Sequence, residues 1–187
     1  PEAVVIVMGC LSQLKAEEML EIKGVKIVLG TTRRESVVEA LEQYLRDKLP
    51  INLVEELKQS EKHDLLSLND FTDKKRAFVK IQDGCNNFCT YCIIPFTRGR
   101  VRSKDKELIL AEVKQLVKRG HIEVVLTGIH TGGYGLDLEN YQLVDLLRDL
   151  EQIEGLLRIR ISSIEISELS EKILNLISQS KKIVHHF

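Results

Sequence analysis

Short apolar runs alternate along the chain with longer stretches in which apolar residues recur every three or four positions. The short runs have the size of buried strands, and the longer stretches have the period of amphipathic helices. Strands are predicted at residues 3–8, 25–29, 77–82, 122–127 and 156–161, with another beginning near residue 183. Helices are predicted at residues 11–21, 33–48, 105–119, 141–151 and 167–179. Strands that alternate with helices predict an α/β fold with parallel strands.

A break in this pattern divides the chain into two predicted domains. Residues 1–50 form a βαβα piece that ends at Pro50. Residues 51–75 are polar and weakly periodic, so they are predicted to form a linker with one short strand. The pattern restarts in residues 76–187, but the strands there are too few to close a barrel, which usually needs eight βα units in about 250 residues. Because the chain begins at Pro1 and stops inside an apolar run, both ends are expected to be cuts.

Composition narrows the class of protein. A chain of 187 residues that is 43% hydrophobic can bury a sizeable core. It has neither a run of about 18 apolar residues, as a membrane span needs, nor a recognisable secretory signal. Its four cysteines are mostly clustered, which fits a reducing cytosol better than a disulfide framework. A cytoplasmic protein without a membrane partner is therefore expected, and the net charge of −1 leaves room only for a local basic patch.

The sharpest chemical signal is a C-x3-C-x2-C run made by Cys85, Cys89 and Cys92, directly after the predicted strand 77–82. Three thiolates at this spacing can bind three irons of a 4Fe–4S cluster and leave the fourth iron open to a substrate. A structural zinc site normally has four protein ligands, so three cysteines favour iron. The alternatives are unrelated core cysteines, a disulfide pair, or a metal-stabilised RNA-binding module without catalysis.

The sequence around this run resembles a known family. The string QDGCNNFCTYCIIP at residues 82–95 and the following FTRGRVRS at residues 96–103 resemble the methylthiotransferase branch of the radical S-adenosylmethionine (SAM) enzymes. MGCLSQ at residues 8–13 resembles the last cysteine motif of that family's N-terminal domain. LTGIHTGGYG at residues 126–135 resembles the subgroup that acts on threonylcarbamoyladenosine in tRNA. The resemblance covers nearly the whole chain and is weakest at residues 50–75.

The resemblance implies a fragment of a larger enzyme. The fold would be a partial N-terminal βαβα domain followed by the first part of a parallel (β/α) radical SAM barrel. The activity would be transfer of a methylthio group to C2 of N6-threonylcarbamoyladenosine at adenosine 37 of tRNA, with an electron donor as a further partner. Alternative substrates within the family are isopentenyladenosine in tRNA and a ribosomal-protein aspartate. A chain that lacks half of the barrel can also be inert as a catalyst, whatever its parent enzyme does.

The resemblance also implies binding residues, although no residue is singled out as a catalytic acid or base. Cys85, Cys89 and Cys92 would hold the cluster that binds SAM. Cys10 would belong to a second 4Fe–4S cluster of the full-length family, whose other cysteine ligands this chain lacks. Residues near predicted strand ends would contact SAM, where barrel chemistry is usually located: Tyr91, Gly128, Ser163 and Glu165. Their alternative roles are packing under the cysteine loop for Tyr91, a flexible turn for the glycines, and helix capping for the serines.

A basic segment follows the cysteine run. Arg98, Arg100 and Arg102 alternate along it and are predicted to bind phosphates near the anticodon loop of tRNA. The alternative is that these side chains simply face water, which is the usual role of a charge run.

Overall fold

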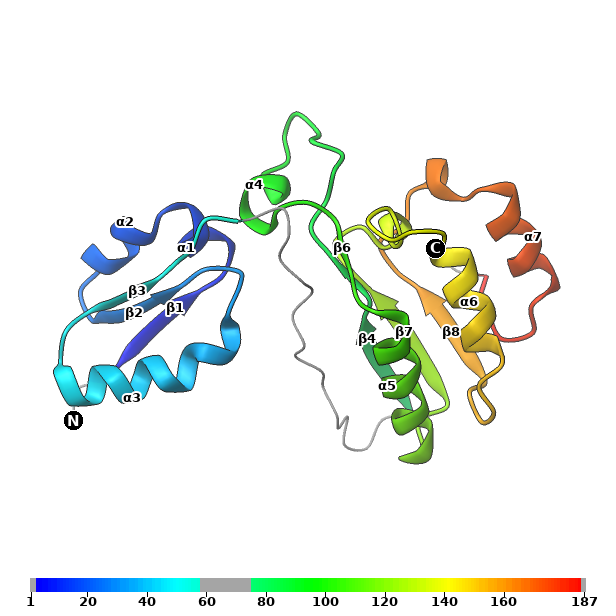
Figure 1. The fold of residues 1–187 in the computed structure, drawn as a ribbon, viewed down its shortest axis with the longest axis horizontal. Coiled ribbons are helices and arrows are strands. Elements are labelled where there is room, and N and C mark those ends of the chain that lie inside the picture. The colour runs from blue at the N-terminus through cyan, green and yellow to red at the C-terminus, as the bar shows by residue number, and fades with distance from the viewer. Residues whose placement is uncertain (1–2, 58–74, 186–187) are drawn as a thin grey trace. The chain divides into compact units, whose positions relative to one another are not determined.

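The structure is a computed structural model that describes residues 3–57 and 75–185. These residues form two compact units, which are described separately below (Figure 1). The first unit contains the described residues up to 57 together with the segment Asn86–Arg100, and the second contains residues 75–85 and 101–185. The predicted linker, residues 51–75, lies outside the described residues from 58 to 74. No described helix combines the length and the apolar character that crossing a bilayer requires.

A three-stranded parallel sheet lies at the centre of the first unit. Its strands, in spatial order, are β1 (Val5–Met8), β2 (Val25–Leu29) and β3 (Ile51–Leu53). Helices α1 (Cys10–Leu14) and α2 (Ala16–Glu21) cover one face, and the turn η1 (Arg34–Ser36) leads into α3 (Val37–Asp47) on the other (Figure 1). The small core between them contains Ile27, Leu29, Ala40 and Ile51.

Three features of the first unit add to the prediction. The helix predicted at 11–21 is two helices, because the backbone of Lys15 leaves the helical region at φ −134° and ψ 46°. The short strand predicted inside the linker is β3, and it pairs with β2 in the register Ile27 to Ile51. The first sheet therefore continues past Pro50. In addition, the segment Asn86–Arg100 belongs to the first unit by its contacts, although the predicted boundaries place it in the second domain. The domain boundaries themselves stay a prediction.

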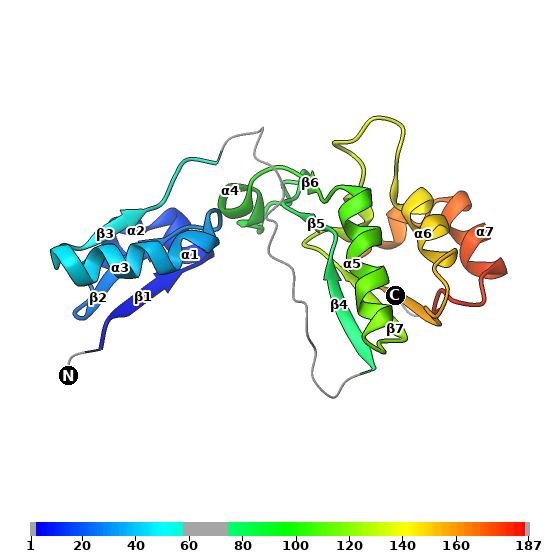
Figure 2. The same cartoon turned by 60° about the horizontal axis from the view of Figure 1, so that its bottom comes forward.

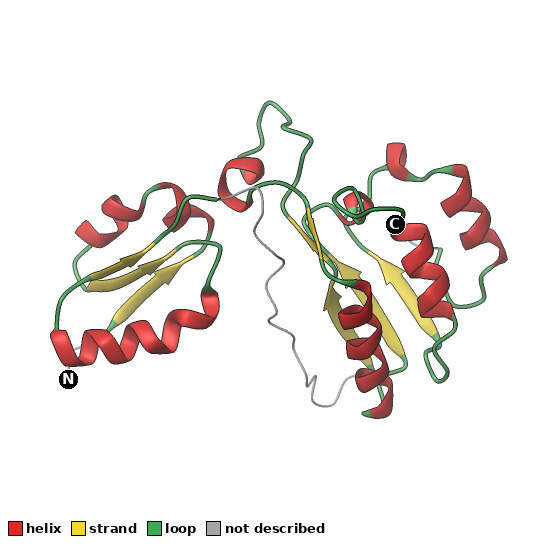
Figure 3. Cartoon of the chain, viewed as in Figure 1, coloured by secondary structure: helices red, strands yellow, loops and turns green. Residues whose placement is uncertain are grey.

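The second unit repeats a strand–helix pattern around another parallel sheet. Its strands, in spatial order, are β4 (Arg76–Lys80), β7 (Glu123–Thr127) and β8 (Arg158–Ile161). Its helices are α5 (Lys106–Lys118), α6 (Leu143–Glu151) and α7 (Glu171–Gln179), with the 3-10 turns η2 (Thr131–Gly133) and η3 (Ile166–Glu168) before the last two. A single parallel bridge from Ile159 to Ile183 lies where the next strand is predicted to begin. Figure 3 shows this alternation by colour.

The helices of the second unit cover one face of its sheet. Alternate strand residues, such as Ala77 and Val79 of β4, are fully buried beneath them, whereas Arg76 and Phe78 point to the other face and are exposed. The core under the helices includes Ile109, Val113, Leu126, Leu147, Ile159 and Ile177. Parallel strands joined through helices on one face confirm the predicted α/β class and agree with a segment of a parallel β/α barrel.

Three short elements between β4 and α5 are not predicted from the sequence pattern. They are β5 (Gln82–Asp83), β6 (Arg102–Ser103) and α4 (Ile94–Arg98). β5 and β6 pair antiparallel, with Gln82 opposite Ser103 and Asp83 opposite Arg102. Figure 2 shows β5 continuing from the end of β4 and β6 leading into α5. The Asp105 side chain caps α5 by accepting the backbone N–H groups of Glu107 and Leu108, so the return from β6 into the helix is well defined.

Candidate functional site

The loops after β4, β7 and β8 leave the same edge of the second sheet, because the three strands are parallel. In parallel β/α barrels this C-terminal edge carries the reacting groups. The three loops contain, in turn, the stem of the cysteine run, the glycine-rich segment 128–135, and the segment 162–168. The predicted strand-end placement of the site residues in these loops agrees with the observed order of elements.

The cysteine loop has a rigid stem within the second unit. The backbone N–H of Ile81 donates to the carbonyl of Thr127 at 2.8 Å, and the N–H of Lys104 donates to the carbonyl of Ile81 at 2.8 Å. The first bond attaches the start of the loop to the strand β7, and the second joins the end of the loop to its start. The hydroxyl of buried Tyr134 donates to the carbonyl of Lys104 at 3.0 Å, which fastens the same stem to the turn η2.

A buried carboxylate organises the stem just before Cys85. Asp83 is 2% exposed, and its Oδ2 lies 2.5 Å from Nζ of Lys80 and 4.0 Å from the guanidinium of Arg102. Its Oδ1 accepts the backbone N–H of Gly84 at 2.9 Å. Gly84 has φ +72°, which favours glycine at this turn. Arg102 is therefore buried beside a carboxylate and is not displayed to a polyanion in this conformation, although it was predicted to bind RNA.

Gln82 is a site residue that sequence reasoning missed. Its side chain is fully buried, and its Nε2 donates to the carbonyls of Asp83 at 2.8 Å and Gly84 at 2.6 Å. Its Oε1 accepts the backbone N–H of His130 at 2.9 Å. The amide thus joins the residue that precedes Cys85 to the loop after β7. The sequence itself shows only a glutamine at the end of a predicted strand, and the partner of its side chain lies 48 residues away.

The three predicted cluster ligands lie on one loop, and none of them forms a disulfide. Cys85 and Cys92 are half-buried and Cys89 is exposed. Cys85 closes the stem that belongs to the second unit, whereas Cys89 and Cys92 lie in the segment that belongs to the first. Phe88 adopts φ +45°, and the N–H of Cys92 donates to the carbonyl of Cys89 at 2.9 Å, so the chain turns tightly through the run. Within the described residues, no three His, Cys, Asp or Glu side chains form a group that could hold a metal ion.

Residues around the cysteines form an exposed aromatic and basic surface on the first unit. Tyr91 is 91% exposed, and the Phe88 and Phe96 rings meet edge-to-face with centroids 5.8 Å apart. The guanidinium of exposed Arg100 lies 4.6 Å from the Phe88 ring centroid, a cation–π distance. Arg98 closes α4 and is half-buried. Two of the three predicted RNA-binding arginines, Arg98 and Arg100, therefore have surface that a nucleic acid can reach.

Gly128 lies where the end of β7 approaches Gln82. A Cβ atom there would be 2.7 Å from Gln82 Oε1 and 3.1 Å from the Gln82 carbonyl oxygen. The close packing of these two strand ends therefore accounts for glycine at this position. This packing does not depend on a ligand, so the predicted SAM contact at Gly128 stays a prediction.

The last predicted pair, Ser163 and Glu165, is engaged in local structure. Ser163 has φ +55°, and its carbonyl accepts the N–H of Thr131 at 3.0 Å. Glu165 is the N-cap of η3, where its side chain and that of Glu168 exchange bonds with each other's backbone N–H groups. Glu168 also contacts Nε2 of the buried His130 ring through its carboxylate. The His130–Glu168 contact, which links the loops after β7 and β8, was not predicted.

Cys10 lies in the first unit, at the C-terminal end of β1. It is half-buried and opens α1, directly after Gly9 with φ +126°. Nearby, the Gln13 side chain joins the ends of the other two strands: its Oε1 accepts the N–H of Thr31 at 2.9 Å, and its Nε2 donates to the carbonyl of Glu55 at 2.7 Å. The hydroxyl of Thr31 donates to the carbonyl of Thr97 at 2.6 Å, which attaches α4 to this edge. Cys10 therefore shares a unit with Cys89 and Cys92.

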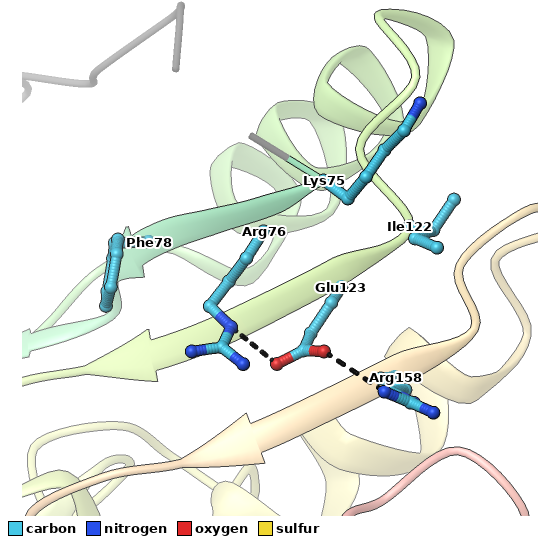
Figure 4. Close-up of a pocket in the computed structure, with 6 residues that line it drawn as sticks. All are labelled: Lys75, Arg76, Phe78, Ile122, Glu123 and Arg158. Carbon is cyan, nitrogen blue, oxygen red and sulfur yellow. Dashed lines mark ion pairs between the residues drawn. The ribbon is translucent and has the colours of Figure 1, made fainter. Parts of the chain in front are cut away.

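A hollow of about 500 Å³ is located at the opposite end of the second sheet (Figure 4). Its lining residues are Lys75, Arg76, Phe78, Ile122, Glu123 and Arg158. Arg76, Glu123 and Arg158 are the first residues of their strands, so the hollow lies at the N-terminal edge. In β/α barrels that edge serves stability and the C-terminal edge serves chemistry. We therefore assign the cysteine loop, and not this hollow, as the candidate site.

The carboxylate of Glu123 is the electrostatic centre of the hollow. It is 2.6 Å from Nε of Arg160, 2.7 Å from Nε of Arg76 and 3.8 Å from NH1 of Arg158. Burial on its own would raise the pKa of this carboxyl, but the hydrogen bond and charge of Arg160, together with the charge of Arg76, act more strongly. The pKa of Glu123 is consequently lowered, and the group stays ionised at neutral pH.

Comparison with known proteins gives the family. The model of the radical SAM superfamily matches residues 79–186, which is more than half of the chain. The chain belongs to the radical SAM superfamily. Membership implies SAM and a 4Fe–4S cluster as cofactors, and the donor set of this chain fits that cluster by its chemistry, since three thiols without disulfide partners lie within one loop.

The relatives of this radical SAM chain have methylthiotransferase names, which confirms the predicted resemblance. Threonylcarbamoyladenosine tRNA methylthiotransferase MtaB of Bacillus subtilis (strain 168) is 46% identical over 187 residues, which are 100% of this chain and 42% of that protein. The MtaB protein of Aquifex aeolicus (strain VF5) is 39% identical over 187 residues, again 100% of this chain and 45% of the relative. The tRNA-2-methylthio-N(6)-dimethylallyladenosine synthase of Dictyoglomus thermophilum is 35% identical over 182 residues, 97% of this chain and 41% of the relative. The chain thus spans less than half the length of these relatives.

Proposed function

We propose that the protein to which this chain belongs transfers a methylthio group to N6-threonylcarbamoyladenosine in tRNA by radical SAM chemistry in the cytoplasm. One observation carries the proposal: a radical SAM chain with a C-x3-C-x2-C run is 46% identical to a relative with that substrate in its name. Identity to the Dictyoglomus dimethylallyladenosine enzyme is lower, at 35%. Dimethylallyladenosine in tRNA is therefore the second candidate substrate.

In this proposal each part of the site has a separate task. Cys85, Cys89 and Cys92 hold the cluster, which when bound supplies an electron, taken from an external donor, for the reductive cleavage of SAM. The loop that contains Gly128 and the segment that contains Ser163 and Glu165 border SAM at the C-terminal edge of the strands. Tyr91 offers an exposed ring beside the last cysteine, where an adenine could stack on it.

Two further parts of the proposal concern the first unit. Cys10 serves a second cluster that supplies the sulfur, completed by ligands from outside this chain. Arg98 and Arg100 bind phosphates of the anticodon region, because both are basic, and the guanidinium of Arg100 lies beside the exposed Phe88 ring, an arrangement that suits single-stranded nucleic acid.

The test of the central proposal is metal content after anaerobic reconstitution with iron and sulfide. The wild-type chain should bind about four irons and four sulfides, and the triple variant Cys85→Ala, Cys89→Ala, Cys92→Ala should bind none. The variant Cys10→Ala is the matched control, since it removes a thiol outside the run and should retain the iron. Zinc in place of iron, or equal iron in the wild type and the triple variant, would refute the assignment.

The substrate is tested separately with the complete protein. Transfer RNAs that carry either threonylcarbamoyladenosine or dimethylallyladenosine are incubated with SAM and a reductant, and the modified nucleosides are then analysed by mass spectrometry. Replacement of one hydrogen by a methylthio group only in the threonylcarbamoyl nucleoside is expected. Modification of only the dimethylallyl nucleoside would refute the proposed substrate and favour dimethylallyladenosine, the second candidate.

A further inference from the structure

We propose that Gln82 is a positioning residue that sets the first cluster ligand and the SAM-facing loop in a fixed relation. This inference rests on the proposed function, because it concerns the same site. Its side chain is fully buried and bonds the backbone of two loops, so we assign it a role through that backbone and not through contact with a cofactor.

The first half of the argument is the bond pattern of its amide group. Nε2 has two hydrogens, and both are used on consecutive carbonyls, those of Asp83 and Gly84. The carbonyl of Gly84 belongs to the peptide bond that leads into Cys85. Its orientation therefore sets the direction in which the chain enters Cys85, and only a side chain with two donors on one atom can hold both carbonyls in this way.

The second half is the link to the neighbouring loop. Oε1 of the same amide accepts the N–H of His130, two residues after Gly128. The backbone of Gly128 packs directly on this oxygen, since a Cβ there would come within 2.7 Å of it. One planar group thus connects the residue before the first thiol with the loop that borders SAM in the proposed function.

Because Gln82 is buried, loss of the hydrogen bonds of its amide would leave their backbone partners unsatisfied. The side chain is 0% exposed, so water does not replace its partners when the amide is removed. Neighbouring contacts fix the frame around it: Lys80 and Arg102 hold Asp83 on one side, and the contact between the His130 ring and the Glu168 carboxylate holds the other loop. The amide is therefore preorganised by its surroundings, as a support for a binding site should be.

Two variants test separately the hydrogen bonds that the amide oxygen accepts and those that the amide nitrogen donates. Gln82→Glu retains an oxygen that can accept the N–H of His130 but places a carboxylate oxygen against the two carbonyls. Gln82→Met has a similar length and forms neither set of bonds. The matched control is Gln115→Met, which makes the same chemical change on an exposed position of α5.

The first readout uses the cofactor-free chain. Hydrogen–deuterium exchange at the amide of His130 should be at least about tenfold faster in Gln82→Met than in the wild type, because its acceptor is gone. In Gln82→Glu this amide should stay protected. Wild-type exchange at His130 in Gln82→Met would overturn the proposed link between the loops.

The second readout uses the reconstituted chain and the electron paramagnetic resonance spectrum of its reduced cluster. Half-saturation of the spectral change on adding SAM should need roughly tenfold more SAM in both variants, at unchanged iron per folded chain. A merely structural role would lower the folded fraction and the iron content without changing the SAM concentration at half-saturation. If the wild type binds iron and responds to SAM while both variants respond at the same concentration, the positioning role is wrong. If the wild type binds no iron, the proposed function itself fails.

Discussion

At the scale of single residues, two opposite effects act on the carboxylate of Glu123 in the second unit. Burial destabilises its charge, and pairing with arginines stabilises it. Glu123 is 6% exposed and would be costly there as an unpaired carboxylate. Three arginines from β4 and β8 approach it, so the ionised form is the stable one. Since the lowered pKa belongs to the folded state only, the stabilisation depends on pH.

This dependence gives a prediction for Glu123→Gln. A carboxyl with a folded-state pKa below its unfolded value of about 4.3 stabilises the fold above that pH, and the stabilisation is lost as the pH falls through the lower folded-state pKa. Urea unfolding of the variant should therefore show a free energy of unfolding lower by roughly 1–3 kcal/mol at pH 7 and a flatter decline below about pH 5. Glu139→Gln, at an exposed loop position, is the control and should follow the wild type. Parallel acid profiles for Glu123→Gln and the wild type would contradict the assignment.

The residue scale also shows where sequence reasoning stops. The cysteine run is visible because its members lie within eight residues, and its spacing alone carries the chemistry. Gln82 and the His130–Glu168 pair are different, since each contact joins residues 38 or 48 positions apart. Such contacts depend on the register of β4 against β7 and β8, which the pattern of apolar residues does not determine. Arg102 illustrates the same limit, because its burial against Asp83 follows from the β5–β6 pairing and not from its place in a basic run.

At the scale of elements, long periodic segments are predicted well and short ones are not. β2 and the helices α5 and α6 match their predictions closely, because each presents a continuous apolar face to a core. β5 and β6 have two residues each, and α4 has five, which is too short for either periodicity to be recognised. These short elements nevertheless build the stem and exit of the cysteine loop. The candidate site therefore depends most on the elements that the sequence pattern predicts least.

The turn η2 provides a prediction about how the stem is held. Burial raises the pKa of the Tyr134 phenol, and the negative charges of Asp105, Asp137 and Asp149 add to this, so the hydroxyl stays protonated and donates to the carbonyl of Lys104. Tyr134→Phe should lower the free energy of unfolding by about 1 kcal/mol and speed amide exchange along β6. Tyr44→Phe on α3, in the other unit, is the control and should leave β6 exchange unchanged. Unaltered exchange along β6 in Tyr134→Phe would show that other contacts suffice to hold the stem.

At the scale of the whole molecule, each of the two units contributes different residues to the proposed function. The second unit provides the parallel sheet edge and the stem of the cysteine loop, while the first provides Cys10 and the segment with the remaining two thiols. The open face of the second sheet, with exposed Phe78 and the hollow around Glu123, is the inner face that a complete barrel would enclose. The relatives are more than twice as long as this chain, so they contain enough sequence for the remaining strands.

The proposed RNA partner gives the prediction that belongs to this largest scale. The net charge of −1 gives this chain no overall attraction for a polyanion, so RNA binding by this chain would depend on a local basic surface such as that of Arg98 and Arg100. The double variant Arg98→Ala, Arg100→Ala should bind an anticodon stem–loop RNA more weakly, and the slope of log affinity against log salt should fall by about 1.4, since each single-stranded phosphate contact contributes about 0.7. Arg148→Ala removes an exposed arginine of α6 that pairs with Asp145, and it should leave the slope unchanged. Fluorescence anisotropy at several salt concentrations measures both quantities. An unchanged slope in the double variant would mean that the RNA is bound by another surface and that Arg100 serves the packing around Phe88.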